Sequence, residues 1–221
     1  MSVLYYIIVI IGVGLSTFLG FKKESPFYLK TFSPFLAFSA IIDYSALYLA
    51  KKGTHTIPLY NISGIIEFCF YLWIFYNIIK SIRIKKIIIL FIVGYPCLSI
   101  LNMLFFQGIN NFNSITYSLG CLIIIIFSIF YFFELFSAEE SYRLSKDPAF
   151  WICTGLLFFY SVSFPVYVSV NLMKHFTPKL GDLISFVIVV LNIVLYSLFC
   201  VAFICQIKLI KNKADNSLVI K

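Results

Sequence analysis

Charged side chains are scarce in this chain of 221 residues: Asp, Glu, Lys and Arg make up 12% of it, whereas 62% is hydrophobic. A water-soluble domain is about 25% charged and about 45–50% apolar, so the composition excludes a soluble fold. It also excludes an intrinsically disordered chain, which needs few apolar residues and many charges. The mean hydropathy of +1.00 indicates an integral membrane protein.

Metal-binding and catalytic groups are also sparse. The two histidines, His55 and His175, have no further ligand at a metal-binding spacing. The six cysteines form no Cys-x-x-Cys pair and fall inside apolar stretches, so neither a disulfide nor a metal site is expected. We therefore expect no metal, no cofactor and no enzyme activity. A lipid-acting enzyme that uses buried carboxyl groups stays open as a third hypothesis, although no nucleophile supports it.

Long connecting segments are missing as well. The longest, Ser137–Pro148, is too short to hold a folded domain. Residues 1–206 are expected to form a single transmembrane domain, and residues 207–221 a basic cytoplasmic tail. Any catalytic or signalling domain must then belong to another chain.

The chain does contain seven apolar stretches, each long enough to cross the ~30 Å hydrocarbon core of a bilayer as a helix. Backbone groups in lipid must be satisfied within their own segment, which favours helices. The predicted spans are Ser2–Phe21, Tyr28–Ala50, Leu59–Lys80, Ile87–Phe106, Ser114–Phe136, Ala149–Met173 and Asp182–Gln206. The sequence therefore predicts an all-α integral membrane protein with seven transmembrane helices.

Lys and Arg are distributed unequally between the two sides of these spans. With the N-terminus outside, 13 of the 17 basic residues fall on the inner side and 4 on the outer side. This bias predicts an N-out, C-in protein of the bacterial cytoplasmic (inner) membrane. The net charge of +8 is then explained by contact with membrane lipid headgroups, and nucleic-acid binding is not expected.

Two carboxyl groups inside the apolar stretches are the strongest indication of a site, because a charge at such depth is costly and is usually functional. Asp43 and Glu67 should both lie ~10–12 Å below the outer surface, on neighbouring helices joined by a short loop. Small or polar residues accompany each of them at helical spacing, so both should face the bundle interior. Two close carboxyl groups cannot both ionise easily in a low dielectric, and we expect at least one to be protonated.

Three further residues join this pair in the predicted cavity of the outer half. Tyr71 follows Glu67 by one helical turn, and Asn192 and Tyr196 are four residues apart in the last span. The group could bind a ligand, couple to a proton or cation, or only hold helices together. Tyr5, near the chain start, is read instead as an interfacial anchor.

Several short motifs resemble a group of short seven-helix membrane proteins of Bacteroidota. They are Leu59-Tyr60-Asn61-Ile62 with Ile66-Glu67-Phe68, the Lys-Asp-Pro-Ala-Phe-Trp-Ile run at 146–152, and Leu191-Asn192-Ile193. The resemblance marks Glu67, Asp147-Pro148, Trp151 and Asn192 as positions of the pattern. It implies a one-domain inner-membrane protein. Genes of this group often lie near sensor histidine kinases, which implies a sensory role.

The leading hypothesis is a receptor-like sensory module whose outer-half cavity takes a small ligand or responds to protons. A cytoplasmic partner, either a sensor kinase or another protein, would read helix shifts at Arg143 and Lys146 or at the basic tail. The alternative is a small proton- or cation-coupled transporter or channel, for which a carboxyl pair near mid-membrane is suited. No internal repeat supports this alternative.

Overall fold

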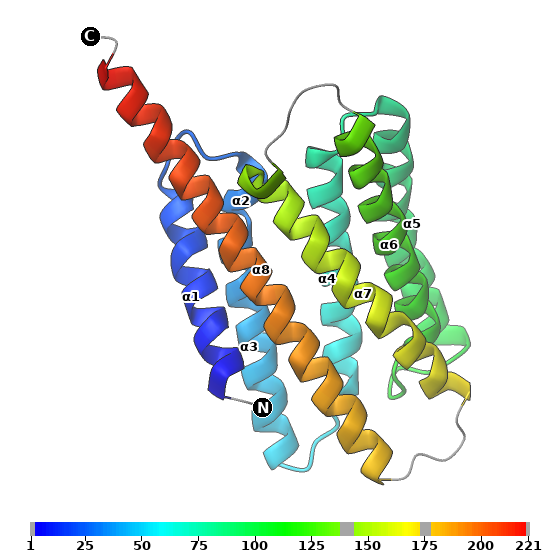
Figure 1. Ribbon diagram of the computed structural model, residues 1–221. Helices are drawn as coiled ribbons and strands as arrows, with labels where there is room; N and C mark the ends of the chain where they lie inside the picture. Colours follow the sequence, from blue (N-terminus) through cyan, green and yellow to red (C-terminus); the bar gives the residue numbers. More distant parts are fainter. Residues whose placement is uncertain (1–2, 138–143, 173–177, 220–221) are drawn as a thin grey trace.

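Seven long helices dominate the computed structural model, which describes residues 3–137, 144–172 and 178–219 (Figure 1). Each is long and apolar enough to cross a membrane, and the described residues contain no strand. The predicted all-helical class and the number of apolar helices are confirmed. The elements are α1 (Val3–Gly20), α2 (Phe27–Lys30), α3 (Phe32–Lys51), α4 (Ile57–Ile78), α5 (Ile82–Phe105), α6 (Ser114–Ser137), the 3₁₀ turn η1 (Leu144–Lys146), α7 (Pro148–Leu172) and α8 (Pro178–Val219).

The predicted spans differ most from the observed helices at two ends. Helix α5 begins at Ile82, five residues before the predicted start, and α8 continues to Val219. Apolar character marks only the part of a helix that fits in lipid, and nothing stops a helix from continuing into water. At 1.5 Å per residue the 42 residues of α8 span about 63 Å. Its C-terminal part therefore projects beyond the other helices (Figure 1).

The second predicted span is divided into α2 and α3 at Thr31. Pro34 explains the break, because its ring lacks the N–H that would bond to the carbonyl of Lys30 and would clash with that carbonyl. In the structure Pro34 lies in the first turn of α3, where a missing N–H costs little. The proline thus starts a helix here and does not kink one.

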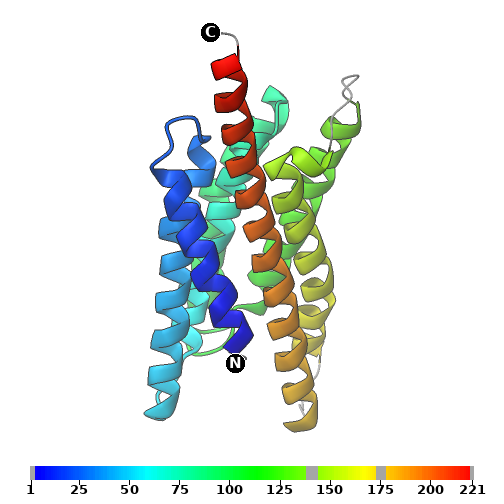
Figure 2. The ribbon, with the colours of Figure 1, turned by 60° about the vertical axis from the view of Figure 1, so that its left-hand side comes forward.

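Six of the long helices pack in a ring, each against the next. Helix α1 packs against α8 and α3, α3 against α4, α4 against α6, α6 against α7, and α7 against α8, while α5 packs outside α4 and α6. Figure 2 shows α1 and α8 side by side in a second view. The core between them is rich in aromatic rings, including fully buried Phe32, Tyr71, Phe75 and Phe199.

A single glycine sets the closest approach between α4 and α6. A Cβ built at Gly120 of α6 would lie 2.7 Å from the ring of Phe68 on α4. Real Cβ atoms do not approach other atoms so closely, so only glycine fits against this buried ring. Phe68 in turn contacts the rings of Tyr95, Tyr117 and Tyr160, which ties α4 to three other helices.

The connections alternate between the two ends of the bundle. The end that carries the N-terminus, called here the N-terminal end, holds the connections 52–56 and 106–113 (Figures 1 and 2). The opposite C-terminal end holds residues 21–26, residues 79–81, η1 and the end of α8. Large apolar side chains such as Ile10, Leu90 and Phe133 are exposed on the sides between these ends. An apolar outer surface of this kind is what contact with lipid tails requires.

Candidate functional site

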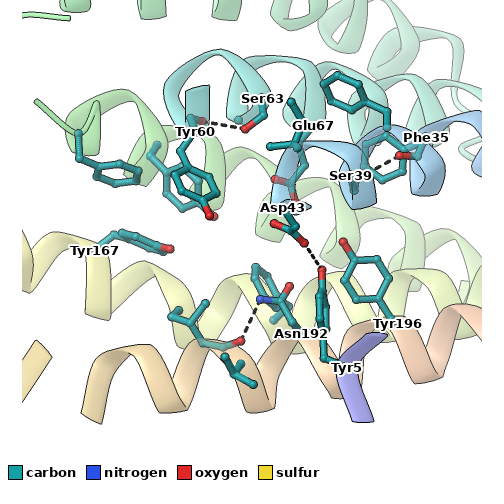
Figure 3. Close-up of a pocket in the computed structure, with 18 of the residues that line it drawn as sticks. Tyr5, Phe35, Ser39, Asp43, Tyr60, Ser63, Glu67, Tyr167, Asn192 and Tyr196 are labelled. Atoms are coloured by element: carbon teal, nitrogen blue, oxygen red, sulfur yellow. Dashed lines mark hydrogen bonds between the residues drawn. The ribbon is translucent and has the colours of Figure 1, made fainter. Parts of the chain in front are cut away.

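A cavity of about 350 Å³ lies among six of the long helices, in the half of the bundle near the N-terminal end (Figure 3). Every long helix except α5 contributes to it, and the α5–α6 connection adds Phe112. The lining residues are Tyr5, Phe35, Phe38, Ser39, Ile42, Asp43, Ile57, Tyr60, Ser63, Gly64, Glu67, Phe112, Tyr117, Phe159, Tyr167, Ile188, Val189, Asn192 and Tyr196.

Both predicted carboxyl groups face this cavity. Helices α3 and α4 are joined at the N-terminal end, and along the helix axes Asp43 lies about 12 Å and Glu67 about 15 Å from that end. Figure 3 shows the two carboxyl groups pointing toward one another. They are close enough to interact electrostatically. The helical stripes that suggested a shared interior therefore bring the pair into one cavity.

Tyr5 holds Asp43 from the neighbouring helix α1. Its hydroxyl donates a hydrogen bond of 2.6 Å to Oδ2 of Asp43, and the tyrosine is only 6% exposed. The interpretation of Tyr5 as an interfacial anchor is wrong. Its side of α1 also carries Gly12 and Ser16, both buried. This small-residue stripe is the signal that could have placed Tyr5 inside the bundle.

Glu67 is held from α7. The hydroxyl of Tyr160, which is fully buried, donates a hydrogen bond of 3.0 Å to Oε1 of Glu67. Glu67 keeps some accessible surface because it faces the cavity. Sequence reasoning did not identify Tyr160 as its partner, since the two residues are 93 positions apart.

Each carboxyl group accepts a hydrogen bond from a tyrosine of another helix. Oδ2 of Asp43 accepts from Tyr5 and Oε1 of Glu67 accepts from Tyr160, and the hydroxyl of Tyr71 lies close enough to Glu67 to interact with its carboxyl group. A carboxylate can accept several hydrogen bonds, so both groups retain capacity for a ligand or water.

Aromatic rings form the other end of the cavity, closer to the N-terminal end of the bundle. The ring of Tyr167 lies 4.3 Å from that of Tyr117 and stacks at 5.3 Å on Phe112. Asn61 fixes the α5–α6 connection that carries Phe112: its amide accepts from the Asn113 N–H at 2.9 Å and donates to the Asn111 carbonyl at 2.9 Å. The cavity thus has an acidic end and an aromatic end.

Of the three other residues predicted to line the cavity, two do and one does not. Asn192 and Tyr196 of α8 line it, and the Asn192 amide donates a hydrogen bond of 3.0 Å to the carbonyl of Ile188 in its own helix. Tyr71 does not line it. This tyrosine is fully buried below the cavity, and its ring packs on Phe35 and Phe199.

Of the two predicted partner-facing residues, the structure describes Lys146, at the opposite end of the bundle. Lys146 is exposed on η1, and Arg143 lies outside the described residues. The turn is fixed to two helices, because the Ser145 carbonyl accepts from the indole N–H of Trp151 at 3.1 Å and from Sγ of Cys205 at 3.0 Å. Trp151 belongs to α7 and Cys205 to α8.

Two carboxylates organise helix starts at this C-terminal end. Glu134 accepts the backbone N–H groups of Lys80 and Ser81 at 2.7 and 2.8 Å, just before α5 begins. Asp147 accepts from the N–H of Ala149 at 2.9 Å and from the Tyr131 hydroxyl at 2.8 Å. Carboxylates at helix N-termini satisfy unpaired N–H groups and balance the helix dipole, which gives both residues a structural role.

No group of three His, Cys, Asp or Glu side chains in the described ranges is placed to hold a metal ion. The polar groups that line the cavity are two carboxyl groups, several tyrosine and serine hydroxyls and an amide. Comparisons with protein-family models, curated proteins and solved structures gave no match to this chain, so inference about the site depends on its own residues.

Proposed function

We propose that the protein is a receptor-like sensory module of a bacterial cytoplasmic membrane, with the cavity as its ligand site. The observation that supports this is a hollow, polar space in a bundle whose core is otherwise packed with apolar rings. Pockets with a few converging polar groups in an apolar lining are typical of small-molecule sites.

The proposed orientation is N-out and C-in, which makes the cavity face the outside. Its support is that the basic residues on the described C-terminal end far outnumber those on the N-terminal end. A fluorescent reporter fused to the C-terminus should be bright in cells, whereas a periplasmic phosphatase fused there should be inactive. The reverse pattern would refute this orientation.

Packing between the cavity and the C-terminal end favours a receptor over an open channel. Fully buried rings of Phe32, Tyr71 and Phe199 fill the bundle there, with ring centres 5.1 and 6.3 Å apart. A channel requires a continuous polar path, and packed, fully buried rings among the described residues are not one. A receptor requires only a site and a means of changing the far end.

Helices α7 and α8 provide that means. Both line the cavity, and both hold η1 at the opposite end through the Ser145 carbonyl. A ligand that changes their relative position would move the exposed Lys146 and the projecting end of α8. A cytoplasmic partner would read this movement; the resemblance noted above implies a sensor histidine kinase.

The test is a thermal-shift screen of the detergent-purified protein against a library of small metabolites. A ligand stabilises the folded state by RT ln(1 + [L]/Kd), so binding raises Tm. The shift should be lost in Glu67→Gln and kept in Asp182→Asn, a variant that removes an exposed carboxyl of α8 away from the cavity. Loss of folding in Glu67→Gln, with no shift in the unaltered protein, would mean that the carboxyl pair is structural.

A small proton- or cation-coupled transporter is the second candidate. One observation favours it: a further hollow of about 230 Å³ at the C-terminal end is lined by Glu134, Asp147 and Lys80, so hollows with ionisable side chains lie on both sides of the packed rings. Proton-dependent uptake into vesicles that is abolished by Asp43→Asn would support transport and contradict a purely sensory role.

A further inference from the structure

The charge of the cavity lining has one sign. The described lining residues include two carboxyl groups and no Lys, Arg or His. An anionic ligand would meet like charge there, and a neutral ligand would leave the carboxyl pair uncompensated at a depth where solvation is poor. A cationic ligand balances the pair.

The hydrogen-bonding capacity of the pair narrows the kind of cation. Asp43 and Glu67 each accept a tyrosine hydrogen bond at one carboxyl oxygen and retain capacity for more, and the two groups point toward one another (Figure 3). An ammonium group has up to three N–H donors and can donate to both carboxyl groups at once. A quaternary ammonium has no N–H and cannot use these acceptors.

The rest of the lining requires an apolar body on the ligand. Tyr60 lies two turns from Glu67 along α4, about 10 Å, and Tyr117, Tyr167 and Phe112 cluster at the same end of the cavity. Aromatic rings stack on flat apolar groups and attract adjacent cations. A bare metal ion would use neither these rings nor a space of about 350 Å³.

We propose that the cavity binds a small organic amine, with its ammonium group between Asp43 and Glu67 and its apolar body against the rings of Tyr117 and Tyr167. The inference rests on the ligand-binding function proposed above and names the chemical class of the ligand. A volume of about 350 Å³ is near the lower limit for pockets that enclose drug-sized molecules, so the amine is a compact one.

The first experiment uses the unaltered protein and three probes of nearly equal size. These are 2-phenylethylamine, 2-phenylethanol and 3-phenylpropionate, measured by thermal shift and calorimetry in detergent at neutral pH. Linear alkylamines of four to eight carbons, tetraethylammonium and sodium chloride complete the series. We expect the primary amines to bind at least about tenfold more tightly than the alcohol, because a charged hydrogen bond is lost without the ammonium. The carboxylate and tetraethylammonium should not bind.

The second experiment locates the bound amine. Asp43→Asn and Glu67→Gln should each weaken 2-phenylethylamine binding about tenfold or more, while Asp182→Asn should leave its Kd unchanged. Tyr167→Leu should weaken the aromatic amine more than butylamine, since only the former stacks on the ring. Tyr44→Leu is its control, because Tyr44 is 72% exposed and outside the lining.

The outcomes separate this inference from the proposed function. If the alcohol or the carboxylate binds as tightly as every amine, or if only sodium stabilises the protein, the amine assignment is wrong. If no amine binds but another metabolite gives a shift that Glu67→Gln abolishes, the assignment is also wrong, although the ligand-binding function stands. If no compound of either set shifts Tm, both fail. The comparison of probes needs no variant, so a poorly folding Asp43→Asn does not affect it.

Discussion

Gly120→Ala tests the close packing of α4 against α6, two helices that line the cavity. The added methyl would lie 2.7 Å from the ring of Phe68, which is 1% exposed and has no room to rotate away from its aromatic neighbours. Overpacking of this kind costs about 1–3 kcal/mol, whereas Ala is favoured over Gly in a helix by about 1 kcal/mol. Gly94→Ala on α5 is the matched control, because a methyl group added there would have no other atom within 4 Å.

The two glycine variants should differ by about 2 kcal/mol in the free energy of unfolding. For a chain of this length such a difference corresponds to about 4–8 °C in Tm. Thermal unfolding in detergent should place Gly120→Ala below the unaltered protein and Gly94→Ala at or above it. Combining Gly120→Ala with Phe68→Leu should cost less than the two single changes together, because the smaller side chain relieves the clash. Equal Tm values for the two glycine variants, or strict additivity in the double variant, would refute the close approach of α4 and α6.

Three further changes test single contacts. Tyr5→Phe removes the hydroxyl that donates a hydrogen bond to Asp43, and should lower the free energy of unfolding by about 0.5–1.5 kcal/mol, measured by thermal unfolding. Its control is Tyr44→Phe at an exposed position, which should leave this free energy unchanged. Glu134→Gln keeps the shape of the side chain but removes the charge of the carboxylate that accepts two backbone N–H groups just before α5. It should lower the free energy of unfolding by about 0.5–2 kcal/mol. An unchanged Tm would argue against this helix cap. Trp151→Phe removes one of the two donors to the Ser145 carbonyl and should speed hydrogen exchange of the 3₁₀ turn, with the helices unaffected; unchanged exchange would contradict its role as an anchor.

The helices and the acidic pair could be predicted because both depend on local information. Apolar length identifies a helix that fits a bilayer, and the short connection between α3 and α4 makes them neighbours whatever the rest of the fold. Asp43 and Glu67 lie at similar distances from this connection along their helices, so they lie at a similar depth in the bundle. The stripe of small residues around each indicates the inward face. These arguments use only residues that are close in sequence.

The partners of that pair could not be predicted in the same way. Tyr5 is 38 positions from Asp43, and Tyr160 is 93 positions from Glu67, so each contact depends on how distant helices are arranged around the bundle. A tyrosine near the start of a span suits an interfacial position as well as a buried one. Tyr71 shows that a shared helix face does not guarantee a shared site. It lies on the same face of α4 as Glu67, but one turn further along the helix, where the packed core replaces the cavity.

The ends of α7 and α8 connect the proposed site to the proposed output. A ligand can shift a conformational equilibrium only by its difference in affinity between two states, so a receptor needs an element that contacts the ligand and differs between the states. Helices α7 and α8 contact the cavity through Tyr167 and Tyr196, and one carbonyl, that of Ser145, joins them at the other end. Because α7 and α8 are joined through this carbonyl, a ligand that changes their separation at the cavity would tilt the part of α8 that projects beyond the joint. In the proposed receptor, the part of α8 beyond the apolar span is the structure that would report the state of the cavity to a partner chain.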